Sequence, residues 1–376
     1  LAPALAERWE RLAPTQMRFH LRLGVRFHDG TPFTADDVVF TIERMRKPGS
    51  QTKGNTLGIA RLVRVDDNTL DVFTDKPLPT LLNQLALAPV MSRAWAVKHG
   101  ATDPLDYAAG KEGYAARHAN GTGPYKLVSF ESGGKVAFVA NPAWWGKPAG
   151  NVTEATYVPI KSNATRLAAL VSGEVDLLVD PPIQDLERLS RNAALKTMRI
   201  EEPRVIFLSF DVARPELKYA SVKGKNPFAD RRVREAVQLS IDTALISQKV
   251  MRGHARPIGS MIAPGIGGYS ARAAVPVKPD PARAMQLMKE AGYADGFSVT
   301  LDCTNDRYLL DEQLCAAVAG MLARIGVRAA PNPKPKAIFF QRMSPENRDT
   351  SLFIIGGFSV TADAHFLLES YLHSTM

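Results

Sequence analysis

Three arginines stand close together at the start of a segment that has the pattern of a helix. In "NPFADRRVREAVQLSID", residues 226 to 242, Arg231, Arg232 and Arg234 occupy the first turn, where the helix macrodipole disfavours cations. They could grip a phosphate, which would indicate a nucleotide or nucleic-acid ligand, or they could brace the fold. A phosphate site at a helix N-terminus normally needs a glycine-rich turn, and this segment has Asp230 instead. We therefore expect Asp230 to cap the helix and the arginines to be structural.

A second group of polar side chains follows an apolar strand. The strand "FSVTLD" runs into "CTNDRYLLDEQL", which places Asn305, Asp306, Arg307 and Tyr308 between a strand end and a helix. Open α/β sheets bind ligands at the carboxyl ends of their strands, so this loop is a candidate binding site. Ordinary capping of the following helix by Asn305 or Asp306 explains the pattern equally well.

The segment "LFIIGGFSVTADAHFLLESYL" repeats this arrangement later in the chain. An apolar strand runs into Gly356 and Gly357, and an aromatic residue, a polar loop and a helix follow. We predict that Phe358 and Asp363 contact a ligand there.

Other positions are weaker candidates. Arg204 and Phe207 lie in the strand "RVIFLSFD", and Arg342 follows "IFF". Arginine can hold a carboxylate through two hydrogen bonds, but it more often forms a surface ion pair. Tyr125 in "GTGPY" could face a ligand, although a tyrosine packed in a strand is the simpler interpretation.

The sequence offers no pattern typical of an enzyme. The seven histidines are scattered, and His365 and Glu369 share a helix face without an HExxH motif. Neither GxSxG nor the phosphate-binding GxxxxGK[ST] motif occurs. We predict no catalytic residue, no metal site and no cofactor. A hydrolase or metalloenzyme acting on small peptides is kept as the alternative.

The composition indicates a globular chain. It has 376 residues, 45% of them hydrophobic, and a net charge of +9 spread along the sequence. Since the basic residues do not gather in runs, a solvated basic surface fits better than nucleic-acid binding. Cys303 and Cys315 fall in a strand and in the following helix, and we favour two buried thiols over a bridge between them.

The order of the elements predicts an α/β architecture. Residues 17–24 alternate as a half-buried strand, and a helix follows with Thr34 as N-cap and Asp37 completing a capping box. Hairpins are expected around the Asp-Asn turn of "RLVRVDDNTLDVFTD" and around Gly133 and Gly134. From Asn163, a candidate N-cap, helices and strands alternate: helix to 173, strand 175–180, helix 184–192, strand 195–202 and strand 204–211.

Four segments together resemble one protein family. "RFHLRLGVRFHDGTPFTADDVVFTIERM", "GTGPYKLVSF", "NPFADRRVREAVQLSID" and "DPARAMQLMKEAGYADGF" occur in this order and spacing. They resemble the extracellular solute-binding proteins of family five, the large peptide- and nickel-type receptors of ABC importers. The likeness covers nearly the whole chain.

The resemblance implies an α/β, two-lobed periplasmic-binding-protein-like fold of type II, the large peptide-binding type. The ligand would lie in a cleft between the lobes. The lobes would close around it by a hinge motion. Residues 1–118 would form an extra subdomain of lobe one, 119–203 the core of lobe one, and 204–376 lobe two. The strand "RVIFLSFD" would cross between the lobes.

The implied function is that of a receptor that captures a peptide or peptide-like solute and delivers it to a membrane permease. The partners would be the permease and ATPase subunits at the inner membrane, with no nucleic acid, and we expect a monomer. The protein would be periplasmic or extracellular, with a membrane anchor on the full-length protein left open. A receptor for a nickel complex or an opine-type solute is the second alternative.

The sequence departs from the family pattern in two respects. Members usually begin earlier and continue past the position of Met376, so we expect this chain to be a fragment that lacks terminal strands of the first lobe. In oligopeptide receptors of this type an acidic residue after an aromatic takes the ammonium of the peptide. An ungapped match places Thr361 there, and Asp363 fits only in a shifted register, which puts recognition of a free ammonium in doubt.

Overall fold

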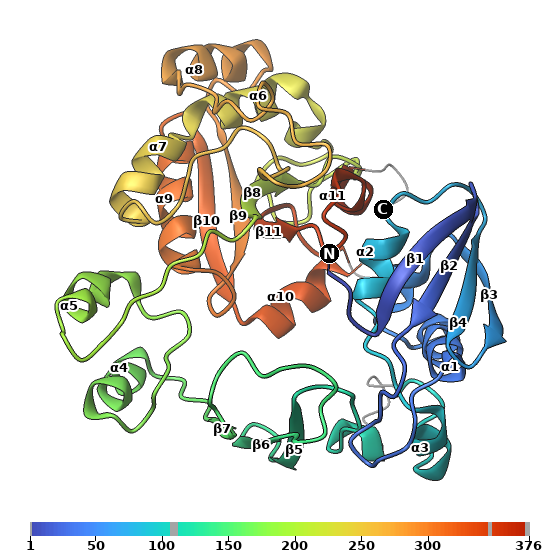
Figure 1. Cartoon of the computed structure of the whole chain (residues 1–376). Coiled ribbons are helices and arrows are strands. Elements are labelled where there is room, and N and C mark those ends of the chain that lie inside the picture. Colours follow the sequence, from blue (N-terminus) through green and yellow to red (C-terminus); the bar gives the residue numbers. More distant parts are fainter. Residues whose placement is uncertain (1, 106–111, 345–347, 373–376) are drawn as a thin grey trace. The chain divides into compact units, whose positions relative to one another are not determined.

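The computed structural model describes residues 2–105, 112–344 and 348–372 of the chain (Figure 1). The chain divides into two compact units, Leu1–Leu178 and Val179–Met376. Each of the three segments predicted as domains holds one β-sheet. The predicted boundaries at 118 and 203 do not coincide with the division after Leu178, and they stay predictions.

The first sheet of unit one contains β1 (Ala6–Ala13), β2 (Gln16–Leu21), β3 (Ile59–Asp66) and β4 (Thr69–Thr74). The strands are antiparallel in the order β1-β2-β4-β3, which confirms the predicted strands in 17–24 and around the Asp-Asn turn. Alternate side chains of β2 and β4 enter a core that includes Phe19, Leu70 and Val72.

Helix α1 (Ala35–Arg46) begins with the predicted capping box. The backbone N–H of Thr34 donates to Asp37 Oδ2 at 2.9 Å, and Asp37 Oδ1 accepts from the backbone N–H of Arg93 at 2.8 Å. The same buried carboxylate therefore caps α1 and fixes the start of α3 (Arg93–Lys98). The short helix α2 (Leu81–Ala86) precedes α3.

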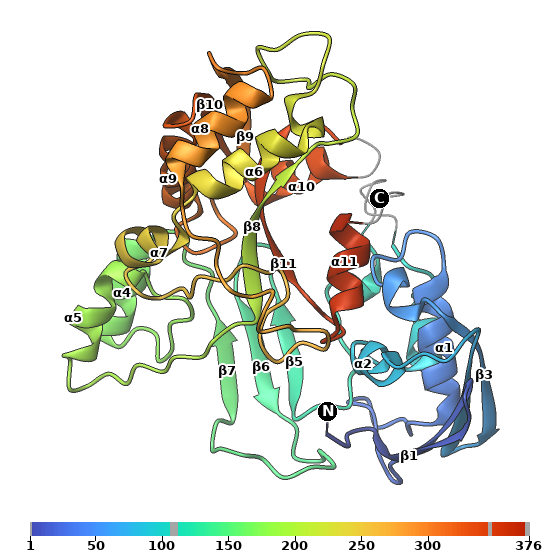
Figure 2. The same ribbon diagram turned by 90° about the horizontal axis from the view of Figure 1, so that it is seen from above.

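The second sheet of unit one contains β5 (Tyr125–Phe130), β6 (Val136–Ala140) and β7 (Glu154–Tyr157), which lie side by side in Figure 2. The tip of the predicted hairpin contains Gly133 at a φ of 70°, a left-handed conformation that favours glycine. Helix α4 (Asn163–Ser172) begins one residue before the predicted position, because Ser162 rather than Asn163 is the N-cap.

Two predicted strands are wrong. Residues 175–180 and 195–202 have no strand structure, whereas α5 (Leu186–Ser190) forms within the helix predicted between them. Leu177 is 80% exposed and Ile200 is 92% exposed. An apolar alternating segment becomes a strand only when a neighbouring strand satisfies its backbone, and no described strand pairs with these segments.

The sheet of unit two is mixed. It contains β8 (Arg204–Phe210), β9 (Phe297–Thr304), β10 (Val327–Lys334) and β11 (Leu352–Phe358) in the order β10-β9-β11-β8. β9 runs parallel to β10 and β11, and β8 is antiparallel to β11. The core of this unit lies between the sheet and three helices, α6 (Arg231–Ser240), α8 (Pro281–Glu290) and α9 (Asp311–Ala323).

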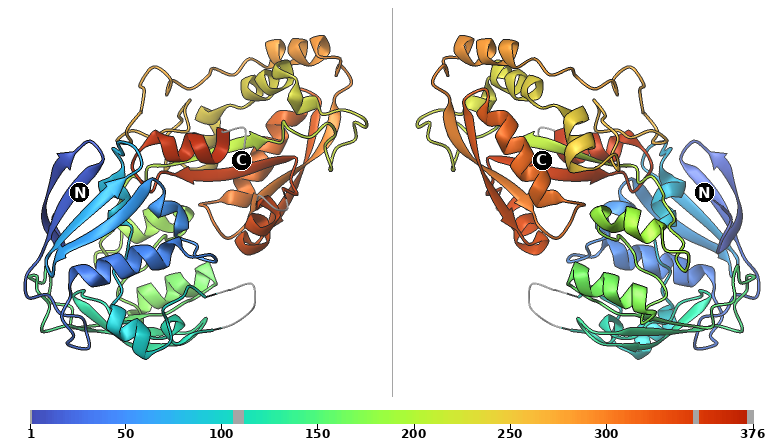
Figure 3. Two further views of the ribbon diagram at one scale, coloured as in Figure 1. Left: turned by 90° about the vertical axis from the view of Figure 1, so that its right-hand side faces the viewer. Right: turned by 90° about the vertical axis from the view of Figure 1, so that its left-hand side faces the viewer.

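The two side views in Figure 3 show α6 and α8 packed against each other. Their apolar stripes bury Val237 and Leu287. Further helices of this unit are α7 (Thr243–Leu245), α10 (Lys336–Met343) and α11 (Ala364–Leu372).

Two of the three arginines at the start of α6 brace the fold as predicted. Asp230 caps α6 by accepting from the backbone N–H of Arg232 at 2.8 Å, and it also accepts from the Arg232 guanidinium at 2.6 Å. Arg232 Nη1 donates to the carbonyl of Glu290, at the end of α8, at 2.7 Å. Arg234 Nη1 donates to the carbonyl of Phe228 at 2.6 Å.

Replacing the cap should test this structural role. We expect Asp230→Ala to lower the free energy of unfolding by about 1 kcal/mol, because the cap hydrogen bond and the partner of Arg232 are both lost. Urea unfolding followed by circular dichroism measures the change. Glu235→Ala, an exposed change on the same helix, is the control. Equal unfolding midpoints for the two variants would contradict the structural role.

Candidate functional site

The pairing of β8 with β11 sets which candidates can meet. Figure 2 shows β8 and β11 side by side. In this antiparallel register Arg204 lies opposite Phe358, and Phe207 lies opposite Ile355. Successive side chains of a strand point to opposite faces, so Arg204 and Phe207 belong to different faces of the sheet.

Four predicted residues come together at one end of this sheet. The Arg204 guanidinium carbon lies 5.6 Å from the centroid of the Phe358 ring and 6.0 Å from that of Tyr308. The guanidinium carbon of Arg307 lies 5.5 Å from the Tyr308 ring. These distances are within the range of cation–π contacts. We call Arg204, Arg307, Tyr308 and Phe358 the arginine–aromatic cluster.

A glycine in β11 makes room for this cluster. A Cβ atom added at Gly356 would lie 2.7 Å from the Tyr308 ring and 2.7 Å from Ile206 Cδ1, so a larger residue would push the tyrosine away. The Tyr308 ring can therefore lie against the backbone of β11, with Phe358 two residues further along on the same face.

The cluster remains partly open to solvent. Phe358 is 36% exposed, and Arg204 forms an ion pair with Glu202 at 2.6 Å. The Glu202 side chain is 57% exposed, and exposed ion pairs contribute little net stability. A carboxylate from a solute could replace Glu202 at modest cost, which suits a binding site.

Phe207 packs in the core on the opposite face. Its ring meets that of Tyr371 edge to face at 5.2 Å, next to the buried Val205 and Leu367. Burial raises the pKa of the Tyr371 phenol above its ordinary value. Phe207 thus points to the sheet face opposite to that of Arg204.

The loop after β9 contains two further candidates, of which one is exposed to solvent and the other has a structural role. Asn305 is exposed, and its backbone N–H donates to the carbonyl of Lys334 at 3.1 Å. Asp306 Oδ1 accepts from the backbone N–H of Lys336 at 2.6 Å, at the first residue of α10. Asp306 therefore caps a helix, though a different one from the helix that the sequence suggested.

The loop after β11 is held by its own polar groups. Thr361 and Ser359 are buried, and Ser359 Oγ donates to the carbonyl of Asp363 at 2.7 Å. Asp363 Oδ1 accepts from the backbone N–H of His365 at 2.8 Å, in the first turn of α11. At least one oxygen of Asp363 thus serves the start of a helix.

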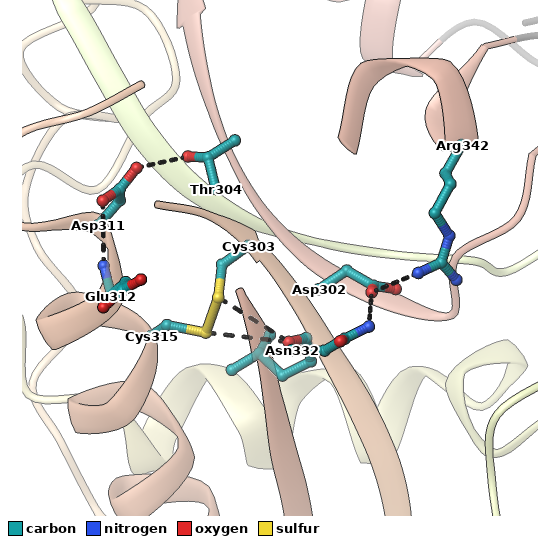
Figure 4. The surroundings of a disulfide bond; sticks show 9 residues. Asp302, Cys303, Thr304, Asp311, Glu312, Cys315, Asn332 and Arg342 are labelled. Atoms are coloured by element: carbon teal, nitrogen blue, oxygen red, sulfur yellow. Dashed lines mark hydrogen bonds and ion pairs between the residues drawn. A yellow bond between two sulfur atoms is a disulfide. The ribbon is translucent and has the colours of Figure 1, made fainter. Parts of the chain in front are cut away.

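Arg342 is engaged inside the protein. Its Nη1 lies 3.1 Å from Asp302 Oδ1, and its Nε lies 3.2 Å from Asp349 Oδ2. Asn332 Nδ2 donates to Asp302 Oδ1 at 2.7 Å (Figure 4), and the Tyr219 hydroxyl donates to Asp349 Oδ1 at 2.8 Å. Arg342 joins β9 to the segment before β11 and has two carboxylates as partners already.

Asp302 is an unusual carboxylate for a protein interior. It is 1% exposed, and its Oδ2 has no hydrogen-bond donor among the described residues. Burial raises the pKa of Asp302, against the opposing effects of Asn332, Arg342 and Lys334. Desolvation is the larger effect because one oxygen has no partner.

This raised pKa predicts a pH-dependent stability. The folded protein binds the proton of Asp302 more tightly than the unfolded chain does. This bound proton therefore stabilises the folded state fully below about pH 4, and the stabilisation is lost as pH rises. We expect the free energy of unfolding of Asp302→Asn, relative to the unmodified chain, to increase between about pH 4 and pH 7.

Urea unfolding at several pH values measures this difference. Asp295→Asn, which removes an exposed carboxylate in the same unit, is the control. A difference for Asp302→Asn that falls as pH rises would contradict the assignment.

The interpretation of the cysteines as free thiols is wrong. Cys303 in β9 and Cys315 in α9 form a disulfide with a Cα–Cα distance of 6.4 Å (Figure 4). Both residues point into the core that the sheet shares with α9. A strand and the next helix pack directly on each other, which brings the two sulfur atoms together although 12 positions separate them.

Removing the disulfide should destabilise unit two. A bridge over this separation stabilises by about 3 kcal/mol in the chain-entropy model. We therefore expect the double variant Cys303→Ala/Cys315→Ala to lose about this much free energy of unfolding, measured in urea without reductant. An unchanged midpoint would show that the bridge is absent in solution.

Tyr125 lies in unit one at the start of β5. Its hydroxyl donates to the carbonyl of Val152 at 2.8 Å, and the residue is exposed. The hydrogen bond ties the edge strand to the segment before β7 and gives the phenol a structural partner.

Sequence reasoning did not select Glu202, Asp302, Asp349 or Tyr371. Glu202 could have been found two positions before Arg204, at the spacing of side chains that share a strand face. The partners of Arg342 are 40 and 7 positions away, so only the fold shows them.

Among the residues that the structure describes, no group of three or more histidine, cysteine, aspartate or glutamate side chains is arranged so that it could hold a metal ion. Within the same residues, no helix combines the length and apolar character that crossing a membrane requires.

Comparison with known proteins identifies relatives among binding proteins. The chain is 27% identical to the glutathione-binding protein GsiB of Salmonella typhimurium strain LT2 over 358 residues, and 26% identical to GsiB of Escherichia coli O157:H7. These alignments cover 93% of this chain and 64% of the relatives. The chain therefore spans less than two thirds of their length.

Solved structures show the same fold. The dipeptide-binding protein of Pseudoalteromonas sp. SM9913 in complex with Met-Leu matches with a TM-score of 0.79 at 23% identity, covering 96% of this chain and 71% of that one. The binding protein AgaA of A. tumefaciens R10 with agropinic acid matches with a TM-score of 0.77 at 24% identity, covering 98% and 70%. These matches confirm the predicted periplasmic-binding-protein-like fold.

A family model matches the whole chain. Residues 1–376 match the model described as bacterial extracellular solute-binding proteins, family 5 middle. The match includes both compact units and the strands that carry the arginine–aromatic cluster.

Proposed function

Since the chain belongs to family 5 of the bacterial extracellular solute-binding proteins, we propose that it captures a peptide or peptide-like solute and delivers it to an ABC importer. The arginine–aromatic cluster is the observation that carries the proposal. It offers two guanidinium groups for carboxylates and two partly exposed aromatic rings for apolar parts of a solute.

The chemistry of the cluster suits a solute with a carboxylate. Within the cluster Arg204 and Arg307 are cationic, and Glu202 is the carboxylate that pairs with Arg204. Thr361 is buried, and Asp363 bonds to the first turn of α11. These placements support a site that recognises a carboxylate more strongly than a free ammonium group.

The relatives supply candidate solutes. Glutathione, the dipeptide Met-Leu and agropinic acid are the ligands named for three of these relatives, and each carries at least one carboxylate. We propose a solute of this kind, a short peptide or an amino-acid conjugate.

The proposed partners are a membrane permease and its ATPase subunits, with the receptor acting as a monomer in the periplasm or outside the cell. The Cys303–Cys315 disulfide supports this location, because disulfides persist in oxidising compartments. A membrane anchor on the full-length protein belongs to the same proposal.

A nickel-complex receptor is a second candidate. The structure of NikZ from Campylobacter jejuni in complex with Ni(L-His) matches with a TM-score of 0.77 at 20% identity, covering 95% of this chain and 69% of that one. This match shows the fold alone. Against direct metal ligation, the arginine–aromatic cluster contains no histidine. We also propose that the chain is not an enzyme, in agreement with the binding proteins to which it is similar.

The proposal predicts solute-dependent stabilisation. Glutathione, Met-Leu, agropinic acid and Ni(L-His) are added separately to the purified full-length protein, and the melting temperature is measured. A solute present at 100 times its dissociation constant stabilises by about 2.7 kcal/mol. We expect one of the three carboxylate solutes to raise the melting temperature without being converted to a product. Hydrolysis of the peptides would support the hydrolase alternative instead.

The contribution of the cluster is tested with Arg204→Ala. Loss of a charge-assisted hydrogen bond worth about 1.5 to 3 kcal/mol should raise the dissociation constant of the solute about 10- to 150-fold. Titration calorimetry measures this change. Arg231→Ala, which removes an exposed arginine of α6, is the matched control and should bind like the unmodified protein. Equal affinities for the two variants would remove Arg204 from the site.

A further inference from the structure

The loop between β9 and α9 carries two members of the arginine–aromatic cluster, Arg307 and Tyr308. Loops are usually more mobile than the strands they follow, and a mobile loop must be ordered when a solute binds. This loop is instead fixed from within by a carboxylate and by a disulfide.

The carboxylate is that of Asp311, the first residue of α9, which is 6% exposed. Its Oδ2 accepts from the Thr304 hydroxyl at 2.7 Å, from the backbone N–H of Arg307 at 3.1 Å and from that of Tyr308 at 3.2 Å. Its Oδ1 accepts from the backbone N–H of Glu312 at 3.1 Å. One side chain thus satisfies donors from the strand end, the loop and the helix.

The disulfide closes the same loop at its base. Cys303 is the residue before Thr304 at the end of β9, and Cys315 lies one helical turn after Asp311 (Figure 4). The covalent bond fixes the strand end relative to the helix that supplies the carboxylate. The hydrogen bonds of Asp311 then fix the backbone at Arg307 and Tyr308.

Backbone strain at Leu310 agrees with a fixed loop. Its φ of 53° and ψ of 39° lie in the left-handed region, which a residue other than glycine seldom adopts. Such a conformation persists where the surrounding structure holds it, and ligand-binding segments are a common place for it.

We propose that Asp311, together with the Cys303–Cys315 disulfide, is a positioning device that holds Arg307 and Tyr308 ready for the solute. The inference rests on the proposed binding function. In this role Asp311 acts through the backbone of the loop. Its contribution is to order the loop before binding, so that less conformational entropy is lost when the solute arrives.

The first test needs no solute. Hydrogen exchange of backbone amides is measured by NMR on the full chain, because the Arg307 and Tyr308 amides are those that Asp311 protects. We expect Asp311→Ala to accelerate exchange at these two amides at least about tenfold, with β10 amides such as that of Ala329 unchanged. Asp311→Asn keeps an acceptor oxygen for the three donors on Oδ2 and should restore most of the protection.

Two further variants complete the set. Glu312→Ala changes the exposed neighbour of Asp311 in the same helical turn and is the matched control, expected to exchange like the unmodified chain. Cys303→Ala/Cys315→Ala should accelerate exchange at the same loop amides. Acceleration spread evenly over β9, β10 and the loop in Asp311→Ala would indicate general destabilisation and overturn the proposal, as would no acceleration at all.

The second test uses the solute among glutathione, Met-Leu and agropinic acid that most raises the melting temperature. We expect Asp311→Ala to weaken its affinity about tenfold, while Asp311→Asn and Glu312→Ala stay close to the unmodified protein. Faster loop exchange with unchanged affinity would overturn the positioning role and leave the proposed function intact. If none of these solutes binds the unmodified protein, the proposed function fails, and the exchange data alone decide whether Asp311 holds the loop.

Discussion

The pairing of β8 with β11 is the constraint on which the arrangement of unit two depends. β11 runs parallel to β9, and β8 joins the sheet in the opposite direction, so the first residue of β8 lies beside the last residue of β11. This register puts Arg204 next to Phe358 at the edge where the loop after β9 also arrives. Residues more than 100 positions apart thereby share one surface, and Gly356 leaves the space that their aromatic neighbour needs.

Unit two shows two uses of charged side chains. Arg204 and Arg307 keep partly open surroundings, whereas Arg342 lies between two carboxylates and Asp311 satisfies four donors. Residue type alone does not separate these roles, because a buried network and an open site draw on the same arginines and aspartates. Burial and the number of partners separate them.

Much of the fold could be predicted from local patterns. The capping box of Thr34 and Asp37, the hairpin tip at Gly133 and the cap of α6 at Asp230 all follow from interactions within a few residues. The strands predicted at 175–180 and 195–202 are wrong, because strand formation depends on a neighbour that the pattern does not contain. The disulfide was missed for a related reason, since it depends on how closely α9 packs on β9.

The location of the candidate site could be predicted from the sequence, but which residues belong to it could be predicted only in part. The rule that ligands bind at strand ends led to Tyr308 and Phe358, whose rings both lie near the Arg204 guanidinium. Phe207 and Arg342 were weaker candidates on other grounds, and their partners are set by sheet face and by tertiary contacts. Strand alternation applied to β8 would have assigned Phe207 to the other face, but only the register of β11 shows that Arg204 has an aromatic neighbour.

The buried disulfide has a chemical consequence for any solute that carries a thiol. Both cysteines of the chain are in the bridge, and each is 1% exposed. A thiol-bearing guest such as glutathione would therefore meet no accessible sulfur with which to form a mixed disulfide. Binding and release of such a guest would leave its oxidation state, and that of the protein, unaltered.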